Sequence, residues 1–169
     1  MSNFSIASRT FGDDPFPFEL TAPTSNSQGS FTYEVTGMGG VATISGSTVT
    51  IVGAGETHIT ATQAANGGYT DGGTSTIFTV NQATTEITGL LNETLSVHDP
   101  TRITYIFSNN TEVAFTVESS NANVATVSIE GSGLTVIAVG AGETTITVTQ
   151  AASQNYTAGS IQATFNVIE

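Results

Sequence analysis

The sequence predicts an all-β chain that folds as two tandem Greek-key β-sandwiches, and three observations support this fold class. The 169 residues are rich in Thr, Ser, Val and Ile, and 18 Gly supply turns. Apolar and polar residues alternate with a period of two, and no segment shows a helical period. A long internal repeat divides the chain into two units of similar length.

One long segment carries the internal repeat. Residues 52–65 recur as residues 139–152, and only two of the aligned positions differ. Repeats of this kind indicate one supersecondary unit used twice. The repeat predicts two domains, which comprise residues 1–83 and 84–169.

The repeat changes its spacing upstream of that segment. Residues 41–44 recur as residues 124–127, at an offset four residues smaller than the offset of the long segment. We attribute the difference to a turn that widens from 45–47 to 128–134, because loops vary in length while the strands beside them persist.

In the first domain, strands are predicted where β-branched and aromatic residues form short runs bounded by Gly, Ser or Asn. In chain order they are Phe31–Val35, Val41–Ser45, Val49–Val52 and Ser75–Asn81. The repeated segment adds one more strand. The residues Gly53 to Glu56 before it are typical of a tight hairpin turn.

The second domain is predicted to contain the same kind of strands. In chain order they are Glu86–Leu90, Ile103–Phe107, Val113–Ser119, Val124–Ile129, Leu134–Val139 and Ser160–Ile168. In residues 144–149, Ile146 and Val148 fall on one face and the odd-numbered Thr residues on the other. That alternation predicts a half-buried strand.

The second domain resembles a known family. Residues 118–127 and 136–148 resemble the bacterial immunoglobulin-like (Ig-like) domain of group 2 type, and the first domain looks like a close relative. The resemblance is weakest over residues 84–112. It implies two tandem Ig-like β-sandwiches. It also implies the settings in which such domains occur, namely adhesins, secreted polysaccharide-binding proteins and bacteriophage particles.

Charge and composition exclude several classes of function. The chain has 14 acidic residues, only Arg9 and Arg102 as fixed cations, and no Lys or Cys, for a net charge of -12. Nucleic acids and anionic membrane surfaces are recognised by clustered cations, which this chain lacks. The absence of Cys excludes disulfides and thiolate zinc sites. No apolar run is long enough to insert into a membrane.

The titratable residues do not assemble into a predicted catalytic or metal site. We expect His58 to lie on the exposed face of a strand, because the second copy has Thr145 there, and His98 to lie in a turn before Asp99-Pro100. Asp13-Asp14 suits a solvated turn better than a calcium site. Glu56 and Glu143 follow the repeated Gly-Ala-Gly, and we expect them to stabilise a turn.

Candidate partner contacts lie in the divergent start of the second domain. They are Leu90, Leu91, Tyr105, Ile106 and Phe107. An unbroken apolar triplet places a large side chain on each face of a strand, so Ile106 or its neighbours face a partner in one interpretation. The favoured interpretation is that Tyr105 and Phe107 fill the core. Near the start of the chain, Phe11, Phe16 and Phe18 are likewise expected to fill the first core.

These observations together predict a non-enzymatic structural or binding protein with no cofactor and no metal. The chain as given shows no export signal or anchor, which favours a bacteriophage virion accessory component of the head, neck or tail, located on the virion surface. Expected partners are capsid or tail proteins, bound through the second domain, and host-surface glycans. A fragment of a bacterial cell-surface adhesin and the carbohydrate-binding module of a secreted enzyme remain alternatives.

Overall fold

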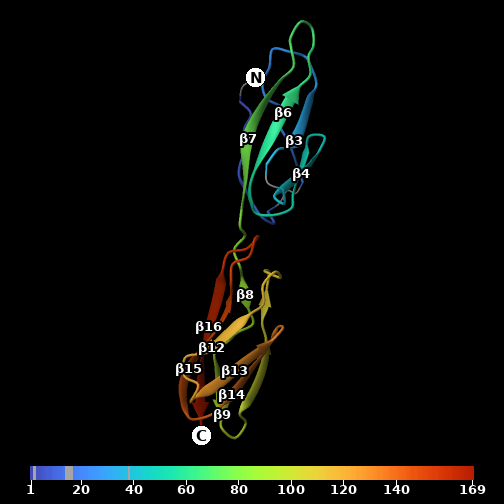
Figure 1. Cartoon of the computed structure of the whole chain (residues 1–169). Coiled ribbons are helices and arrows are strands. Elements are labelled where there is room, and N and C mark those ends of the chain that lie inside the picture. Colours follow the sequence, from blue (N-terminus) through green and yellow to red (C-terminus); the bar gives the residue numbers. More distant parts are fainter. Residues whose placement is uncertain (2, 14–16, 38) are drawn as a thin grey trace. The chain divides into compact units, whose positions relative to one another are not determined.

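The computed structural model describes residues 1, 3–13, 17–37 and 39–169, and the fold is all-β (Figure 1). The chain divides into two compact units, Met1–Ala83 and Thr84–Glu169. Each unit is an Ig-like β-sandwich built from two facing sheets. No helix long and apolar enough to cross a membrane occurs in the described part of the chain.

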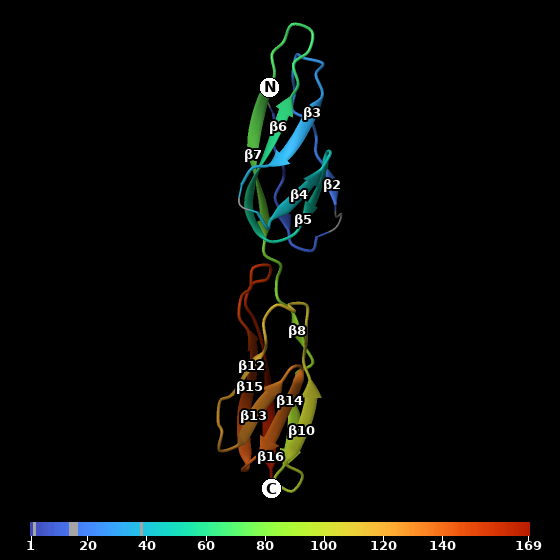
Figure 2. The same ribbon diagram turned by 45° about the vertical axis from the view of Figure 1, so that its right-hand side comes forward.

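The first unit places a four-stranded sheet against a three-stranded sheet (Figure 2). The larger sheet contains, in spatial order, β1 (Arg9–Thr10), β7 (Gly72–Asn81), β6 (Gly55–Gln63) and β3 (Phe31–Val35). The smaller sheet contains β2 (Phe18–Glu19), β5 (Thr48–Ile51) and β4 (Ala42–Ser45). Neighbouring strands are antiparallel except for β1, which runs parallel to β7.

The second unit repeats this arrangement and adds one strand pair. Its larger sheet contains, in spatial order, β12 (Thr116–Ser119), β15 (Gly142–Gln150), β16 (Gly159–Ile168) and β9 (Glu93–Ser96). Its smaller sheet contains β10 (Thr101–Tyr105), β14 (Gly133–Ala138) and β13 (Ala125–Glu130). A separate pair is formed by β8 (Ile87–Thr88) and β11 (Phe107–Ser108).

Strand alternation builds a separate core in each unit. Along β15, the residues at even positions are buried and the Thr residues between them are partly exposed, which confirms the predicted alternation. The core of the first unit centres on Val49, Ile59 and Phe78, and that of the second on Leu134, Ile146 and Phe165. Burial of each such side chain stabilises the folded unit by ~1.5–3 kcal/mol.

The predicted hairpin turn at Gly53 to Glu56 is wrong. The strand before it, β5, lies in the smaller sheet, and the strand after it, β6, lies in the larger sheet. The segment is therefore an arch that carries the chain from one sheet to the other. The positive φ of Gly55 (139°) suits this change of direction, because residues with a side chain rarely adopt it.

The widened turn that the repeat suggested is in fact a longer hairpin. Both hairpins have two-residue turns, Gly46-Ser47 in the first unit and Gly131-Ser132 in the second. The four additional residues extend the two strands by two residues each. Because side chains alternate between faces along a strand, two extra residues keep the core side chains pointing inward.

Most other predicted strands match the observed strands with shifts at their ends. The strand Phe31–Val35 is confirmed as predicted. The predicted strand Ile103–Phe107 is interrupted at Ile106, whose amide donates to the carbonyl of Ser132 (2.8 Å). The strand Glu93–Ser96 was not predicted, and it pairs in parallel with the end of β16.

Candidate functional site

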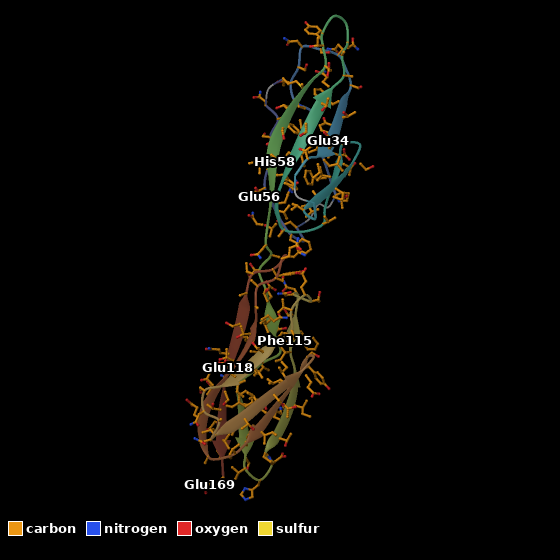
Figure 3. The ribbon with its side chains drawn as sticks, viewed as in Figure 1. Glu34, Glu56, His58, Phe115, Glu118 and Glu169 are labelled. Atoms are coloured by element: carbon orange, nitrogen blue, oxygen red, sulfur yellow. The ribbon has the colours of Figure 1, made fainter. Side chains whose placement is uncertain are left out.

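The two histidines are both exposed. His58 is exposed on β6 opposite Ile77, as predicted (Figure 3). His98 is exposed in the turn between Ser96 and Asp99. Within the described ranges, no group of three or more His, Asp or Glu side chains could hold a metal ion. The described residues therefore contain no such cluster for metal-assisted chemistry.

The repeated glutamates do not stabilise turns, which corrects the sequence prediction. Glu56 and Glu143 are each the second residue of a strand, β6 or β15, and both are exposed. The carboxylate of Glu56 accepts a hydrogen bond from the hydroxyl of Thr79 on the neighbouring strand (3.1 Å). The two residues thus occupy solvent-facing positions in the sheets.

The acidic pair at the start of the first unit is only half described. Asp14, Pro15 and Phe16 lie outside the described residues. The carboxylate of Asp13 accepts a hydrogen bond from the amide of Thr10 (3.2 Å), and its own amide donates to the carbonyl of Thr10 (3.1 Å). These contacts form a local turn, as predicted for Asp13.

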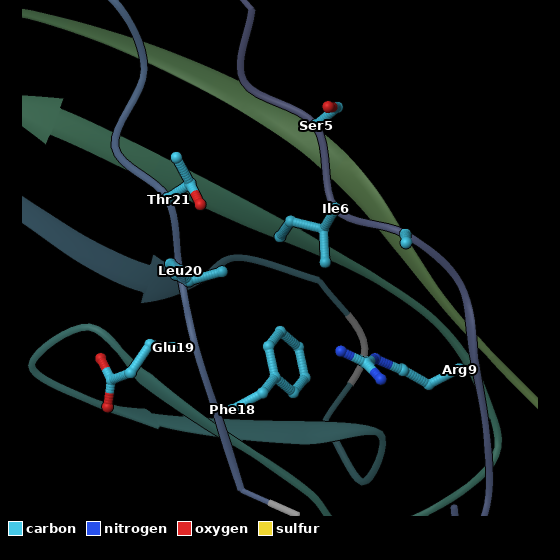
Figure 4. Close-up of a pocket in the computed structure, with 8 residues that line it drawn as sticks. Ser5, Ile6, Arg9, Phe18, Glu19, Leu20 and Thr21 are labelled. Atoms are coloured by element: carbon cyan, nitrogen blue, oxygen red, sulfur yellow. The ribbon is translucent and has the colours of Figure 1, made fainter. Parts of the chain in front are cut away.

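Phe11 and Phe18 pack against the core of the first unit, as predicted. The ring of Phe18 lies 5.6 Å from the ring of Phe78. The guanidinium of Arg9 lies over the ring of Phe18, 5.0 Å from the ring centre (Figure 4). A small cavity of about 150 Å³ lies beside this pair. The cation is thus held against an aromatic face, an arrangement that contributes to stability by itself.

The five candidate partner contacts divide into buried and exposed residues. Leu90 and Ile106 are 4% and 0% exposed and belong to the second core, so the interpretation that places Ile106 against a partner is wrong. Leu91, Tyr105 and Phe107 are 72%, 61% and 63% exposed. The expectation that Tyr105 and Phe107 fill the core is also wrong, because the strand turns Ile106 inward between them.

The first unit provides an internal comparison for Tyr105 and Phe107. Thr48 and Gly133 are the first residues after the two-residue turns of the two hairpins. Glu19 lies opposite Thr48, and Tyr105 lies opposite Gly133. The amide of Leu20 bonds to the Ser47 carbonyl, just as the amide of Ile106 bonds to that of Ser132.

Tyr105 and Phe107 therefore replace Glu19 and Thr21 of the first unit. In that unit, the carboxylate of Glu19 accepts hydrogen bonds from the hydroxyls of Ser47 (2.6 Å) and Thr48. These hydrogen bonds lower the pKa of Glu19 below its usual value. The same position is thus polar and ionised in one unit and aromatic in the other.

Two more exposed apolar side chains lie on the smaller sheet, which contains Tyr105, whereas Phe107 lies on the adjoining strand β11. Ile103 precedes Tyr105 by two residues on β10, and Ile137 lies on the neighbouring strand β14 opposite Thr101. They are 59% and 43% exposed. We refer to Ile103, Tyr105, Phe107 and Ile137 as the apolar face. Each of these four side chains is large, apolar and exposed.

The first unit has its own aromatic group, at another place. The rings of Phe31 and Tyr33 on β3 are stacked, with centroids 6.3 Å apart and planes 20° apart, and Phe4 lies 6.2 Å from Tyr33. Phe31, Thr32 and Tyr33 face the turn Gly46-Ser47 across an open cleft of about 480 Å³. We call this the aromatic cleft.

Sequence reasoning missed two buried glutamines that occupy equivalent positions. Gln63 and Gln150 end the strands β6 and β15, and they are 4% and 2% exposed. Gln63 donates to the carbonyls of Ser27 (3.1 Å) and Gly29 (2.8 Å). Gln150 donates in the same way to Asn110 (3.0 Å) and Val113 (2.6 Å). Each amide ties the loop before a neighbouring strand to the core.

A signal for these glutamines exists in the sequence. They recur in phase with the inward-facing residues, because Ile146, Val148 and Gln150 follow one another at every second position. A polar residue in that phase is expected to be buried and to bond to backbone groups.

No protein-family model and no curated protein matches the chain. Among solved structures, domains 4–9 of the surface layer protein SbsC are 18% identical with a TM-score of 0.45, and the match covers 90% of this chain and 24% of that one. Domains 4 and 5 of SbsC are 19% identical with a TM-score of 0.42, and the match covers 90% of this chain and 80% of that one. Drosophila N-cadherin EC1-3 is 12% identical with a TM-score of 0.42, and the match covers 96% of this chain and 63% of that one.

The chain thus spans about a quarter of the first of these structures. At these identities and TM-scores the likeness carries no argument about function. The fold assignment rests on the sheets of the chain itself.

Proposed function

We propose that the chain is a non-enzymatic structural protein that attaches to a larger assembly through its second unit and displays its first unit toward glycans. The observation that carries the proposal is the apolar face, in which Tyr105 and Phe107 stand where the first unit has Glu19 and Thr21. Large aromatic side chains are enriched at the centres of protein interfaces, and they are unfavourable on a free surface.

The setting that we propose is a bacteriophage virion, with the chain as an accessory component of the head, neck or tail. The resemblance of residues 118–127 and 136–148 to bacterial Ig-like domains of group 2 type supports such a setting, because those domains occur on virions. The same domains also occur on bacterial cells, so a bacterial cell-surface adhesin is the alternative.

Immunogold electron microscopy with antibodies against the chain tests the setting. Regular labelling of virus particles is the expected result. Labelling confined to the envelope of the host cell would establish the alternative and refute the virion proposal.

Attachment through the apolar face is tested by replacing Tyr105 and Phe107 with the residues that the first unit has at those positions. The purified chain is added to virus particles that were prepared without it. The unaltered chain should sediment with these particles. A chain with both Tyr105→Glu and Phe107→Thr should stay in the supernatant. His58→Thr, which introduces the second unit's own residue into the first unit, is the control. Undiminished sedimentation of the folded double variant would show that the apolar face does not attach the chain.

A further inference from the structure

We infer that the first unit binds a neutral carbohydrate chain in the aromatic cleft between Phe31 and Tyr33 on β3 and the turn Gly46-Ser47. The inference rests on the proposed display function and assigns a site and a ligand class to it. The cleft volume of about 480 Å³ lies within the ~300–1,000 Å³ range of small-molecule sites, so it can admit a sugar ring.

The aromatic wall of the cleft suits the apolar face of a sugar. The planes of the Phe31 and Tyr33 rings are 20° apart, and the ring of Phe4 lies 6.2 Å from that of Tyr33. All three side chains are only partly buried, so they retain surface that a ligand can cover. The negative faces of aromatic rings attract the weakly positive C–H groups of a pyranose ring, which burial also removes from water.

The polar groups of the cleft suit sugar hydroxyls. Burial raises the pKa of Tyr33 above its usual value, so its hydroxyl remains protonated at neutral pH and can donate a hydrogen bond. The hydroxyl of Ser47 donates a hydrogen bond to the carboxylate of Glu19 (2.6 Å). The lone pairs of the Ser47 oxygen can therefore accept a hydrogen bond from a ligand. The cleft therefore offers both a donor and an acceptor.

The charges around the cleft favour a neutral ligand. Neither Arg nor His lines it, and the residues that do are Phe31, Thr32, Tyr33, Gly46 and Ser47. The carboxylate of Glu19 lies directly behind Ser47, where hydrogen bonds lower its pKa and keep it ionised. An anionic sugar in the cleft would be repelled by this negative charge.

The second unit keeps Phe115 at the position of Phe31, but it lacks the second ring of this wall. Thr32 pairs with Thr62 and Thr116 pairs with Thr149, the repeat equivalent of Thr62, so Val117 stands where the first unit has Tyr33. The corresponding cleft of the second unit includes Phe107, and it is therefore continuous with the apolar face that we assign to attachment. The stacked pair of Phe31 and Tyr33 is thus a property of the first unit.

The test is a titration of the full chain, followed by the amide signals in two-dimensional NMR spectra. The probes are maltohexaose, cellohexaose and chitohexaose as neutral chains, and hexagalacturonic acid as an anionic chain. At least one neutral probe should shift the amides of residues 31–33 and 46–47 at millimolar concentration. The anionic probe should leave them unchanged.

Variants then test the contribution of Tyr33. Replacing Tyr33 by the second unit's residue, Tyr33→Val, should weaken binding about tenfold or more, as truncation of a central aromatic residue does. Tyr33→Phe keeps the ring and the fold while it removes the hydroxyl, and it should weaken binding less than Tyr33→Val. His58→Thr lies away from the cleft and should bind like the unaltered chain.

Three results would overturn the inference. They are unchanged signals with every neutral probe, equally tight binding of hexagalacturonic acid, or unaltered binding by both Tyr33 variants. If any of these results is found while the chain still attaches to particles, the sugar site is refuted and the proposed attachment is not. Conversely, a chain with Tyr105→Glu and Phe107→Thr should keep its sugar binding even where it no longer attaches.

Discussion

At the scale of single residues, the buried amides of Gln63 and Gln150 explain how each unit closes one of its loops. A buried carbonyl that loses its hydrogen bond costs free energy, because water can no longer reach it. Each glutamine prevents this loss at two carbonyls, Ser27 and Gly29 in one unit and Asn110 and Val113 in the other. One side chain thereby fixes a loop without any regular structure.

Replacing Gln150 tests this role. Gln150→Ala leaves the carbonyls of Asn110 and Val113 without their donor, so we expect the free energy of unfolding of the second unit to fall by roughly 2 kcal/mol or more. Chemical denaturation monitored by circular dichroism measures the change. Gln162→Ala, at an exposed position on β16, is the control and should change stability little. An equally small effect of Gln150→Ala would contradict the role.

Glu19 gives the first unit a dependence on acidity. The hydrogen bonds from Ser47 and Thr48 lower its pKa below 4.5 in the folded state. A lowered carboxyl pKa stabilises the fold above the unfolded pKa, and this stability is lost as the pH falls through the folded value. The melting temperature of the first unit should therefore fall less steeply below about pH 4.5 in a Glu19→Gln variant than in the unaltered chain. Glu34→Gln, at an exposed position on β3, is the control for the loss of one carboxylate.

At the scale of strands, the arches between sheets depend on glycine. Gly55 and Gly142 open β6 and β15 with φ values of 139° and 144°. A Cβ atom at Gly142 would lie 3.0 Å from a methyl group of Val124, and one at Gly55 would lie 3.1 Å from a methyl group of Val41. Both the backbone conformation and the packing thus exclude a larger residue.

A Gly142→Ala chain should be less stable than the unaltered chain by about 1 kcal/mol or more, because alanine fits poorly at a positive φ. Thermal unfolding measures the loss. Gly39→Ala serves as the control, since a Cβ atom there meets nothing within 4 Å and the φ angle is not positive. A loss of equal size in both variants would show that the arch does not require glycine.

The sequence predicts strands better than it predicts connections between them. Alternation places Ile146 and Val148 correctly on the core face, because a half-buried strand needs that pattern wherever it lies. Whether Gly53 to Glu56 form a hairpin or an arch depends instead on which sheet the next strand joins. The sheet that the next strand joins is determined by contacts between residues far apart in the chain. A local turn pattern contains no information about those contacts.

The side chains of Tyr105, Ile106 and Phe107 illustrate a second limit. An apolar triplet fits either face of a strand, so its pattern alone does not decide which residue is buried. The polar neighbours of Leu20 resolve the ambiguity in the first unit, since Glu19 and Thr21 must face water. Matching these three residues to the triplet would have predicted that Ile106 is buried and its neighbours exposed.

At the scale of the whole molecule, one scaffold carries two different surfaces. The first unit has two partly buried aromatic residues on β3, beside the turn Gly46-Ser47, and an ionised Glu19 on its smaller sheet. The second unit has Val117 in place of Tyr33, and its apolar face extends from its smaller sheet to Phe107 on β11. Because each core is built from its own strands, either surface can change without disturbing the other unit.

The same separation of cores predicts that the two units unfold independently. Val49 and Leu134 are equivalent core residues, both 0% exposed, and they belong to clusters with no residue in common. Differential scanning calorimetry of the full chain should resolve two transitions. Leu134→Ala should lower only the transition of the second unit, by ~2–5 kcal/mol in free energy of unfolding, and Val49→Ala only that of the first. With both substitutions the two losses should add, because the sites are independent. A single transition that shifts with either substitution would instead show that the units fold as one cooperative body.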